Sequence, residues 1–195
     1  MNNLAKFLTE YVITKGMIME EERQEYEYGF IVAIEKGISL FISILIAIAM
    51  DMIAESILFF VIFIPLRKYA GGLHLRKYIS CLILSCLTFS VVMLISKFLT
   101  LDHFTGLVLI ICMDILIYIM YPAENINRIV DDNENKYFKA QLIKHLLINL
   151  LISTVCIIFC QETYVVIIVM TLLLITCTMF IGKVKYNMEK EIPSN

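Results

Sequence analysis

MIAESILFFVIFIPL (residues 52–66), RKYAGGLHLRKY (67–78) and ISCLILSCLTFSVVMLISKFL (79–99) follow one another directly in the chain. The two outer segments are apolar runs close to the roughly 20 residues that an α-helix needs to cross a bilayer core. The segment between them carries four cations, a Gly-Gly pair and one His. A simple connection between two helices needs cations at most and does not need a His. The stretch therefore predicts two membrane-spanning helices joined by a polar connection that contains reactive groups.

The composition of the whole chain agrees with this prediction. Of the 195 residues 60% are hydrophobic, and the mean hydropathy is +0.84. Soluble domains are roughly 45–50% apolar. The apolar runs indicate six spans, of which the second and the fifth are short: 30–50, 52–66, 79–99, 103–121, 145–160 and 163–182. We therefore expect residues 1–195 to form one all-α polytopic membrane domain with about six transmembrane helices.

The positions of the cations predict the orientation in the membrane. Fourteen of the 16 Lys and Arg residues fall in four segments, namely 1–29, 67–78, 122–144 and the tail from residue 183. The connections between those segments hold almost none. Cytoplasmic loops carry the excess of Lys and Arg in membrane proteins. Both termini and the connection 67–78 are therefore predicted to be cytoplasmic.

The N-terminal segment differs from the spans. Its apolar residues recur at intervals of three and four, as on one face of a helix: Leu4, Phe7, Leu8, Tyr11 and Val12. Residues 1–29 are thus predicted to be a cytoplasmic amphipathic segment that lies on the membrane surface or receives a peptide. No cleavable signal peptide is expected, since the first 28 residues carry six Glu and lack an uninterrupted apolar core.

Four charged residues fall inside predicted spans: Glu35, Lys36, Glu55 and Asp114. Such residues usually face a bundle interior, a partner or water. They support an alternative function, a small membrane transporter or export component with Glu35, Glu55 and Asp114 along a polar path. Glu35 and Lys36 are also close enough to an interface to snorkel towards it. A structural or assembly protein is a third interpretation, in which none of these groups is essential.

The six cysteines give little sign of a metal site. All but Cys81 fall within apolar runs, where a free Cys usually behaves as a small hydrophobic residue. No CxxC motif is present, and Cys156 and Cys160 share a helix face without a neighbouring His or carboxylate. We therefore expect neither a metal nor a cofactor.

Cys81 and His74 are candidates for a nucleophile and its base. A thiol becomes reactive when an imidazole, cations or a helix N-terminus favour the thiolate. Lys77 lies four residues before Cys81, and Ser80 is predicted to cap the third span, which would place Cys81 in its first turn. The plain alternative is an ordinary cytoplasmic loop whose His is solvated and whose Cys begins a helix.

The spacing of this pair constrains the local structure. On one straight helix, residues seven apart are separated by about 10.5 Å of rise, too far for a thiol–imidazole hydrogen bond. A catalytic pair therefore requires that residues 67–81 are not one continuous helix. Gly71 and Gly72 supply a break, because glycine adopts backbone angles that other residues avoid. We expect a loop over about 71–78 that folds His74 back over Cys81.

The motif formed by Arg67, Ala70, Gly71, Gly72, His74 and Cys81 resembles that of the accessory gene regulator B (AgrB) family of quorum-sensing peptide-processing proteases. The chain length, the multispan layout and the position of the motif after the second apolar run are also similar to the family, as are Tyr28 with Gly29 and Tyr121 with Pro122. The chain departs from the family at Leu75, where many members have a small residue. The departure concerns the detailed preference for substrate.

The resemblance implies a mechanism for the candidate residues. The family nucleophile corresponds to Cys81 and the base to His74. Members cut a small precursor peptide, here an AgrD-like one, on its C-terminal side and hold the product as a thioester. An internal Cys or Ser then closes a thiolactone or lactone ring, which is the autoinducing peptide. The tethered ring closure is intramolecular and is therefore favoured over hydrolysis.

The other residues of the motif have less specific roles. Arg67 or Lys68 is expected to contact phospholipid headgroups or an acidic precursor tail. Gly71, Gly72 and Lys77 are candidates for substrate binding or for structure, and the chemistry of Glu35 and Glu55 admits either as a third catalytic group. The predicted partners are the precursor and the lipid bilayer, with no nucleic acid. A homodimer, the precursor and the ring size stay open.

Overall fold

The computed structural model describes residues 2–73, 78–122, 132–159 and 162–191. These residues form seven α-helices and one short 3₁₀ helix, in the order α1 (Asn2–Thr14), η1 (Glu20–Glu22), α2 (Arg23–Met50), α3 (Ile53–Ala70), α4 (Tyr78–Phe98), α5 (His103–Met120), α6 (Asp132–Ile158) and α7 (Glu162–Glu191). No β-strand occurs in the ranges described. The predicted all-α class is confirmed.

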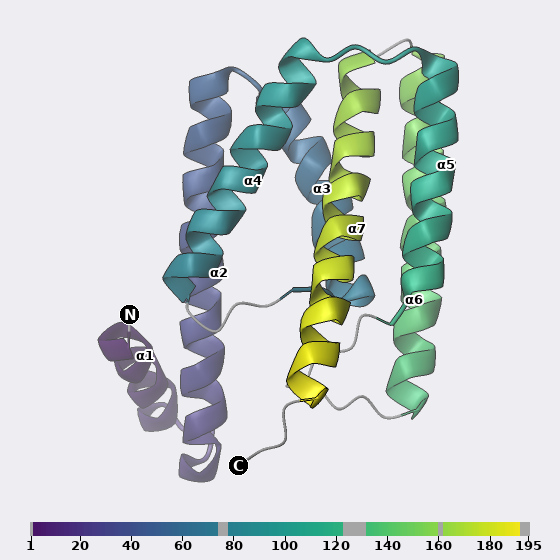
Figure 1. Cartoon of the computed structure of the whole chain (residues 1–195). Helices are drawn as coiled ribbons and strands as arrows, with labels where there is room; N and C mark the ends of the chain where they lie inside the picture. Colours follow the sequence, from purple (N-terminus) through teal and green to yellow (C-terminus); the bar gives the residue numbers. More distant parts are fainter. Residues whose placement is uncertain (1, 74–77, 123–131, 160–161, 192–195) are drawn as a thin grey trace.

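Helices α2 to α7 form a bundle in which successive helices run in opposite directions (Figure 1). The N-terminal helix α1, the end of α3, the start of α4 and the end of α7 all lie at the end drawn lowest in Figure 1. We call this the lower end. The α2–α3 and α4–α5 connections lie at the opposite, upper end. The fold thus gathers the two termini and residues 71–73 at one end of the molecule.

Within the described residues, five helical segments are long and apolar enough to cross a membrane: Glu20–Met50, Tyr78–Phe98, His103–Met120, Glu134–Ile158 and Glu162–Met188. The sixth bundle helix, α3, has 18 residues and carries Glu55, Arg67 and Lys68. It runs between the upper and lower ends alongside the others (Figure 1). The chain is therefore a multi-pass membrane protein.

Three bundle helices are markedly longer than the predicted spans. Helix α2 begins at Arg23 instead of residue 30, and α7 continues to Glu191 instead of ending near residue 182. The prediction that the fifth span is short was wrong, since α6 has 27 residues. In each case the helix extends beyond its apolar part at the lower end. Hydropathy marks only the residues suited to lipid, whereas helical hydrogen bonding continues through the polar residues outside it.

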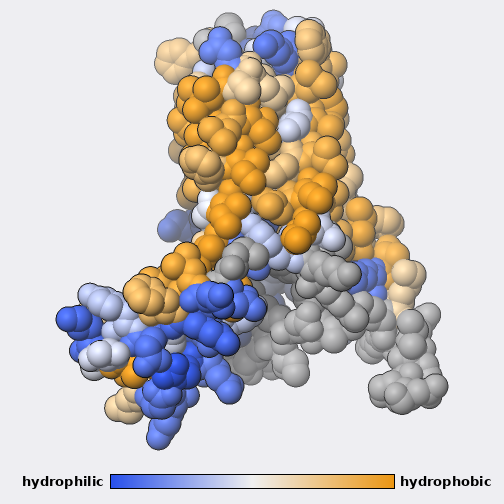
Figure 2. Space-filling view, turned by 90° about the vertical axis from the view of Figure 1, so that its left-hand side faces the viewer, coloured by the Kyte–Doolittle hydropathy of each residue, from blue (hydrophilic) through white to orange (hydrophobic). Residues whose placement is uncertain are grey.

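The surface of the bundle is suited to lipid. Figure 2 shows a broad apolar band between polar regions at the two ends. Large apolar side chains of α2 and α4 are exposed there, including Phe41, Ile48, Leu87 and Leu94. A soluble monomer rarely exposes an apolar patch larger than a few hundred Å². The band accordingly marks the part of the molecule within the bilayer.

Helix α7 is the centre of the bundle. In the apolar 18-residue stretch of α7, 56% of the residues are buried, compared with 11–22% in the corresponding stretches of the other four membrane-crossing segments. It packs against α3, α4, α5 and α6. Helix α5 approaches closely at Gly106, where a Cβ would overlap with the side chain of Val165. Small residues permit such close packing of membrane helices, which stabilises them through van der Waals contact.

The predicted N-terminal helix is confirmed as α1. It packs against α2 and buries Ala5 and Thr9. An ion pair of 2.8 Å between Arg23 Nη1 and Glu10 Oε2 links the start of α2 to α1. The apolar side chains of Leu4, Phe7 and Tyr11 are exposed. These are the residues that the sequence predicts to lie on a membrane surface or against a peptide.

Candidate active site

The connection after α3 begins with two glycines in unusual conformations. Helix α3 ends at Ala70, and the φ angles of Gly71 and Gly72 are 81° and 130°. Other residues rarely adopt positive φ, since their Cβ would clash with the backbone. Residues 67–81 are therefore not one continuous helix. The predicted break at Gly71 and Gly72 is confirmed.

Arg67 is the anchor of this connection. From the last turn of α3, its guanidinium donates hydrogen bonds to the carbonyl oxygens of Gly71 and Leu73. A Cβ at residue 72 would overlap with that guanidinium, so only glycine fits there. Burial lowers the pKa of Arg67, and Cys81 opposes this shift electrostatically. The structure thus gives Arg67 a partner in its own chain, where the sequence predicted headgroups or a precursor tail.

Cys81 lies near the start of α4, at the same end of the bundle as residues 71–73 (Figure 1). Its side chain is partly buried and forms no disulfide. Its electrostatic interaction with Arg67 places the two groups in one neighbourhood. The predicted capping role of Ser80 was wrong, because α4 includes Tyr78 and Ile79 and so contains Ser80. Cys81 is nonetheless within about one turn of the first described residue of α4.

Tyr78 connects the start of α4 to α2. Its hydroxyl donates a hydrogen bond of 3.1 Å to the carbonyl oxygen of Glu35. The same hydroxyl interacts electrostatically with the side chains of Glu35 and Cys81. Glu35 is thus linked through Tyr78 to the start of α4. Glu55 lies in the first turn of α3, about 18 Å of helix away from Arg67.

Two predicted site residues, His74 and Lys77, lie outside the described residues. The structure describes the chain on either side of them, up to Leu73 and again from Tyr78. Lys68 Nζ lies 5.2 Å from the centre of the Tyr69 ring. The carbonyl oxygens of Gly71 and Leu73 accept hydrogen bonds from Arg67 instead. Among the described residues, the structure brings together Arg67, residues 71–73 and Cys81, and Tyr78 links the start of α4 to Glu35 of α2.

The role of Arg67 can be tested by a change to Lys. Arg67→Lys keeps the charge but replaces a planar fork of donors with one ammonium, which cannot serve both carbonyl oxygens in the same way. We expect the backbone amides of residues 71–73 to exchange hydrogen about tenfold faster, the consequence of losing one charged hydrogen bond. Hydrogen exchange with mass spectrometry measures this. Lys68→Ala is the matched control, and equal exchange in Arg67→Lys and wild type would contradict the role.

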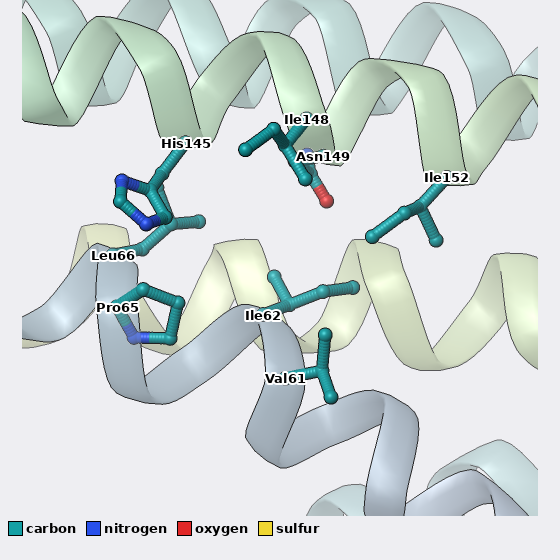
Figure 3. A pocket seen from close by; sticks show the side chains of 8 residues that line it. All are labelled: Val61, Ile62, Pro65, Leu66, His145, Ile148, Asn149 and Ile152. Carbon is teal, nitrogen blue, oxygen red and sulfur yellow. The ribbon is translucent and has the colours of Figure 1, made fainter.

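A second polar feature lies inside the bundle. The side-chain amide of Asn149 on α6 donates to both carboxylate oxygens of Asp114 on α5, at 3.1 Å each. Next to Asn149 is a cavity of about 20 Å³ between α3 and α6, also lined by His145, Pro65 and Val61 (Figure 3). The His145 ring stacks on Tyr69 of α3, with 5.2 Å between ring centres.

The sequence analysis missed several of these residues. Asn149 is a single amide within an apolar run, which is the signal that would have marked it as a buried polar group. Tyr78 carries no signal in the sequence, because its partner is a backbone oxygen of a distant helix. His145 follows Lys144 in the sequence, which gives no sign that its ring stacks on Tyr69 of α3 and lines the cavity.

Comparison with known proteins assigns the chain to a family. A family model described as Accessory gene regulator B matches residues 2–180. The chain belongs to the accessory gene regulator B family. AgrB proteins are membrane proteins involved in the processing of quorum-sensing peptides, and the predicted resemblance is thereby confirmed. No curated protein and no solved structure gave a significant match to the chain. The roles of individual residues in this AgrB protein consequently rest on its own geometry.

Proposed function

We propose that this AgrB protein is a membrane-embedded cysteine peptidase that cuts a small AgrD-like precursor on its C-terminal side, with Cys81 as nucleophile and His74 as general base. The observation that carries the proposal is the arrangement around Arg67. Arg67 binds the segment that leads directly into His74 and also lies within electrostatic range of Cys81.

The proposed reaction has two acyl transfers. His74 takes the proton of Cys81, and the thiolate attacks the carbonyl carbon of the scissile peptide bond. The C–N bond breaks, the amine of the C-terminal fragment receives the proton, and a thioester forms on Cys81. An internal thiol or hydroxyl of the bound product then attacks the thioester. His74 takes the proton of that thiol or hydroxyl and passes it to Cys81, which leaves as a thiolate, and the peptide is released as a thiolactone or lactone.

The proposed orientation places this site on the cytoplasmic side. Arg67, Lys68, Lys136, Lys139, Lys183 and Lys185 belong to the helix portions at the lower end, where both termini lie (Figure 1). The described connections at the upper end hold Asp51 and Asp102, with Lys97 nearby. Because cytoplasmic segments carry the excess of Lys and Arg, the lower end faces the cytoplasm in this proposal.

A variant in which Cys81 is the sole cysteine tests the proposal directly. The other five, Cys86, Cys112, Cys156, Cys160 and Cys177, are replaced by Ala. The purified variant is reconstituted in nanodiscs and incubated with a synthetic AgrD-like candidate precursor. Release of the C-terminal fragment, and its loss after alkylation of the one remaining thiol, is the expected result by mass spectrometry. Cleavage by wild type that survives alkylation of all its thiols would refute the cysteine mechanism.

The transporter alternative makes a different prediction. If the protein were a transporter that uses intramembrane carboxylates, Glu55→Gln and Asp114→Asn would abolish its function. The peptidase proposal predicts cleavage within about twofold of wild type for Glu55→Gln, since a surface change away from a functional contact usually alters stability by under about 0.5 kcal/mol. The rate of release of the C-terminal fragment measures this. A complete loss in Glu55→Gln, with the protein inserted normally, would favour the alternative.

A further inference from the structure

Residues 71–73 are held from a second side by α7. The Leu73 N–H donates a hydrogen bond of 3.0 Å to the carbonyl oxygen of Thr178. Four residues further along α7, Gly182 is buried against the same segment. Residues four apart lie on one face of a helix, so both contacts come from a single face of α7. We call Thr178 and Gly182 together the α7 contact.

The contact at Gly182 leaves no room for a side chain. A Cβ there would lie 2.9 Å from the carbonyl carbon of Gly72, 3.0 Å from the nitrogen of Leu73 and 3.2 Å from the Cα of Gly72. All three are backbone atoms, which cannot rotate away as the end of a flexible side chain can. The segment is thus enclosed between the Arg67 guanidinium on one side and the backbone of α7 on the other.

We propose that Thr178 and Gly182 are positioning residues for the reaction proposed above, on which this inference rests. They touch neither Cys81 nor the substrate in this proposal. They fix the path of residues 71–73, and Leu73 directly precedes His74 in the sequence. A methyl group at residue 182 pushes this segment off α7 and breaks the hydrogen bond between Leu73 and Thr178. The base is then misplaced relative to Cys81, although both catalytic groups are intact.

The test uses Gly182→Ala with two matched glycine changes. Gly37→Ala lies in α2 where no atom is within 4 Å of the added Cβ, and Gly106→Ala creates an overlap with Val165 away from residues 71–73. We expect Gly182→Ala to lower kcat about tenfold or more and to leave KM within about twofold, because even small misplacement of reacting groups is costly. A synthetic AgrD-like candidate precursor that the wild type cleaves serves as the substrate, and each rate is expressed per folded molecule.

A second readout needs no substrate. In Gly182→Ala the Leu73 amide should exchange hydrogen about tenfold faster than in wild type, as expected for the loss of one hydrogen bond. Gly106→Ala should lower the thermal midpoint but leave both kcat and the exchange of Leu73 unchanged. A merely structural role for Gly182 predicts that Gly182→Ala behaves as Gly106→Ala does, and this result would overturn the inference.

The outcomes separate the inference from the proposed function. Wild-type cleavage that does not depend on Cys81 refutes the function, while the exchange of Leu73 still tests the contact. An unprotected Leu73 amide in the wild type overturns the inference even if Gly182→Ala fails to fold. Cys81-dependent cleavage with an unchanged kcat in folded Gly182→Ala also overturns it.

A different observation carries a second proposal, for a bound water. Asn149 is buried, and its oxygen Oδ1 has no hydrogen-bond partner in the described residues, since its amide nitrogen serves Asp114. This residue lines the cavity of about 20 Å³ between α3 and α6, and Figure 3 shows its oxygen in the space between the two helices. A cavity needs about 10–15 Å³ and polar partners to hold one water.

The second partner comes from α3. Pro65 has no N–H, so the carbonyl of Val61, four residues earlier, lacks its regular helical donor. Carbonyl groups freed by proline in membrane helices are satisfied by side chains or by ordered water. We propose that one water occupies the cavity and donates its two O–H groups to Asn149 Oδ1 and the Val61 carbonyl. The water thereby joins α6 to α3 within the membrane.

A double-variant cycle tests the bridge. Asn149→Leu removes one acceptor, and Pro65→Ala restores the regular donor to Val61. If one water joins both groups, the fall in thermal midpoint for the double variant is smaller than the sum of the single effects, since either change already removes the bridge. Additive effects would overturn the proposal. Water-edited solid-state NMR provides an independent check: polarisation transfer from water to the Asn149 amide is expected in wild type, and its absence also overturns the proposal.

Discussion

Cells that express Cys81→Ala together with a tagged precursor are expected to accumulate the uncut peptide. The expected loss in cleavage is about 10³-fold or more, since removing a catalytic nucleophile abolishes the covalent path and leaves only binding and electrostatic effects. An immunoblot of the tag quantifies the ratio of cut to uncut precursor. The amount of protein in the membrane should not change, because a partly buried thiol near a helix end loses little when it becomes a methyl group.

The matched control for this change lies on the same helix. Cys86 is also partly buried and free, five residues further along α4. Cys86→Ala should cleave the precursor within about twofold of wild type, as expected for a residue without a role in the reaction. Equal processing by Cys81→Ala and wild type would end the peptidase proposal. Equal losses in Cys81→Ala and Cys86→Ala would indicate an effect on the stability of α4 instead.

The helices were well predicted from the sequence because a bilayer imposes a simple rule on every segment that crosses it. Lipid offers no hydrogen bonds, so each segment that crosses must be a helix of sufficient apolar length. Six such runs were recognised, and six bundle helices are observed. The rule does not extend to the ends of helices outside lipid. This explains why α2 and α6 begin earlier than predicted, in polar residues such as Arg23.

The candidate site was predictable where its residues are close in sequence. The distance argument for residues 67–81 needs only the rise of a helix and the permissive angles of Gly71 and Gly72. The partners of Arg67 are also local, yet chemistry alone predicted phospholipid headgroups or an acidic precursor tail. Sequence spacing cannot show that an arginine side chain will turn back along its own chain, because that depends on burial.

Contacts between distant helices were beyond prediction from one sequence. Gly182 follows Leu73 by more than 100 residues, and nothing in the sequence indicates that the two touch. The pairing of Asp114 with Asn149 likewise joins two helices whose relative rotation is set by packing around α7. The sequence did predict that Asp114 would face the bundle interior, a partner or water, since an intramembrane carboxylate rarely faces lipid.

The break between α3 and α4 makes a catalytic role for His74 geometrically accessible. One continuous helix would separate residues 74 and 81 by about 10.5 Å along its axis. Helix α3 instead ends at Ala70. Residues 71–73 then form hydrogen bonds with the Arg67 side chain and with the backbone of α7. Leu73, the residue before His74, is thus held at the same end of the bundle as the start of α4, which carries Cys81 (Figure 1).

His74→Ala is therefore expected to reduce cleavage about 10²–10⁴-fold, the range typical of a lost general base. Wild-type cleavage should also fall at acidic pH, because a protonated imidazole no longer accepts a proton from a thiol. The residual activity of His74→Ala should lack this dependence. Fragment release measured across the pH range tests both points. His103→Ala, at the upper-end start of α5, is the control, and a decline of equal size in that variant would contradict a specific role for His74.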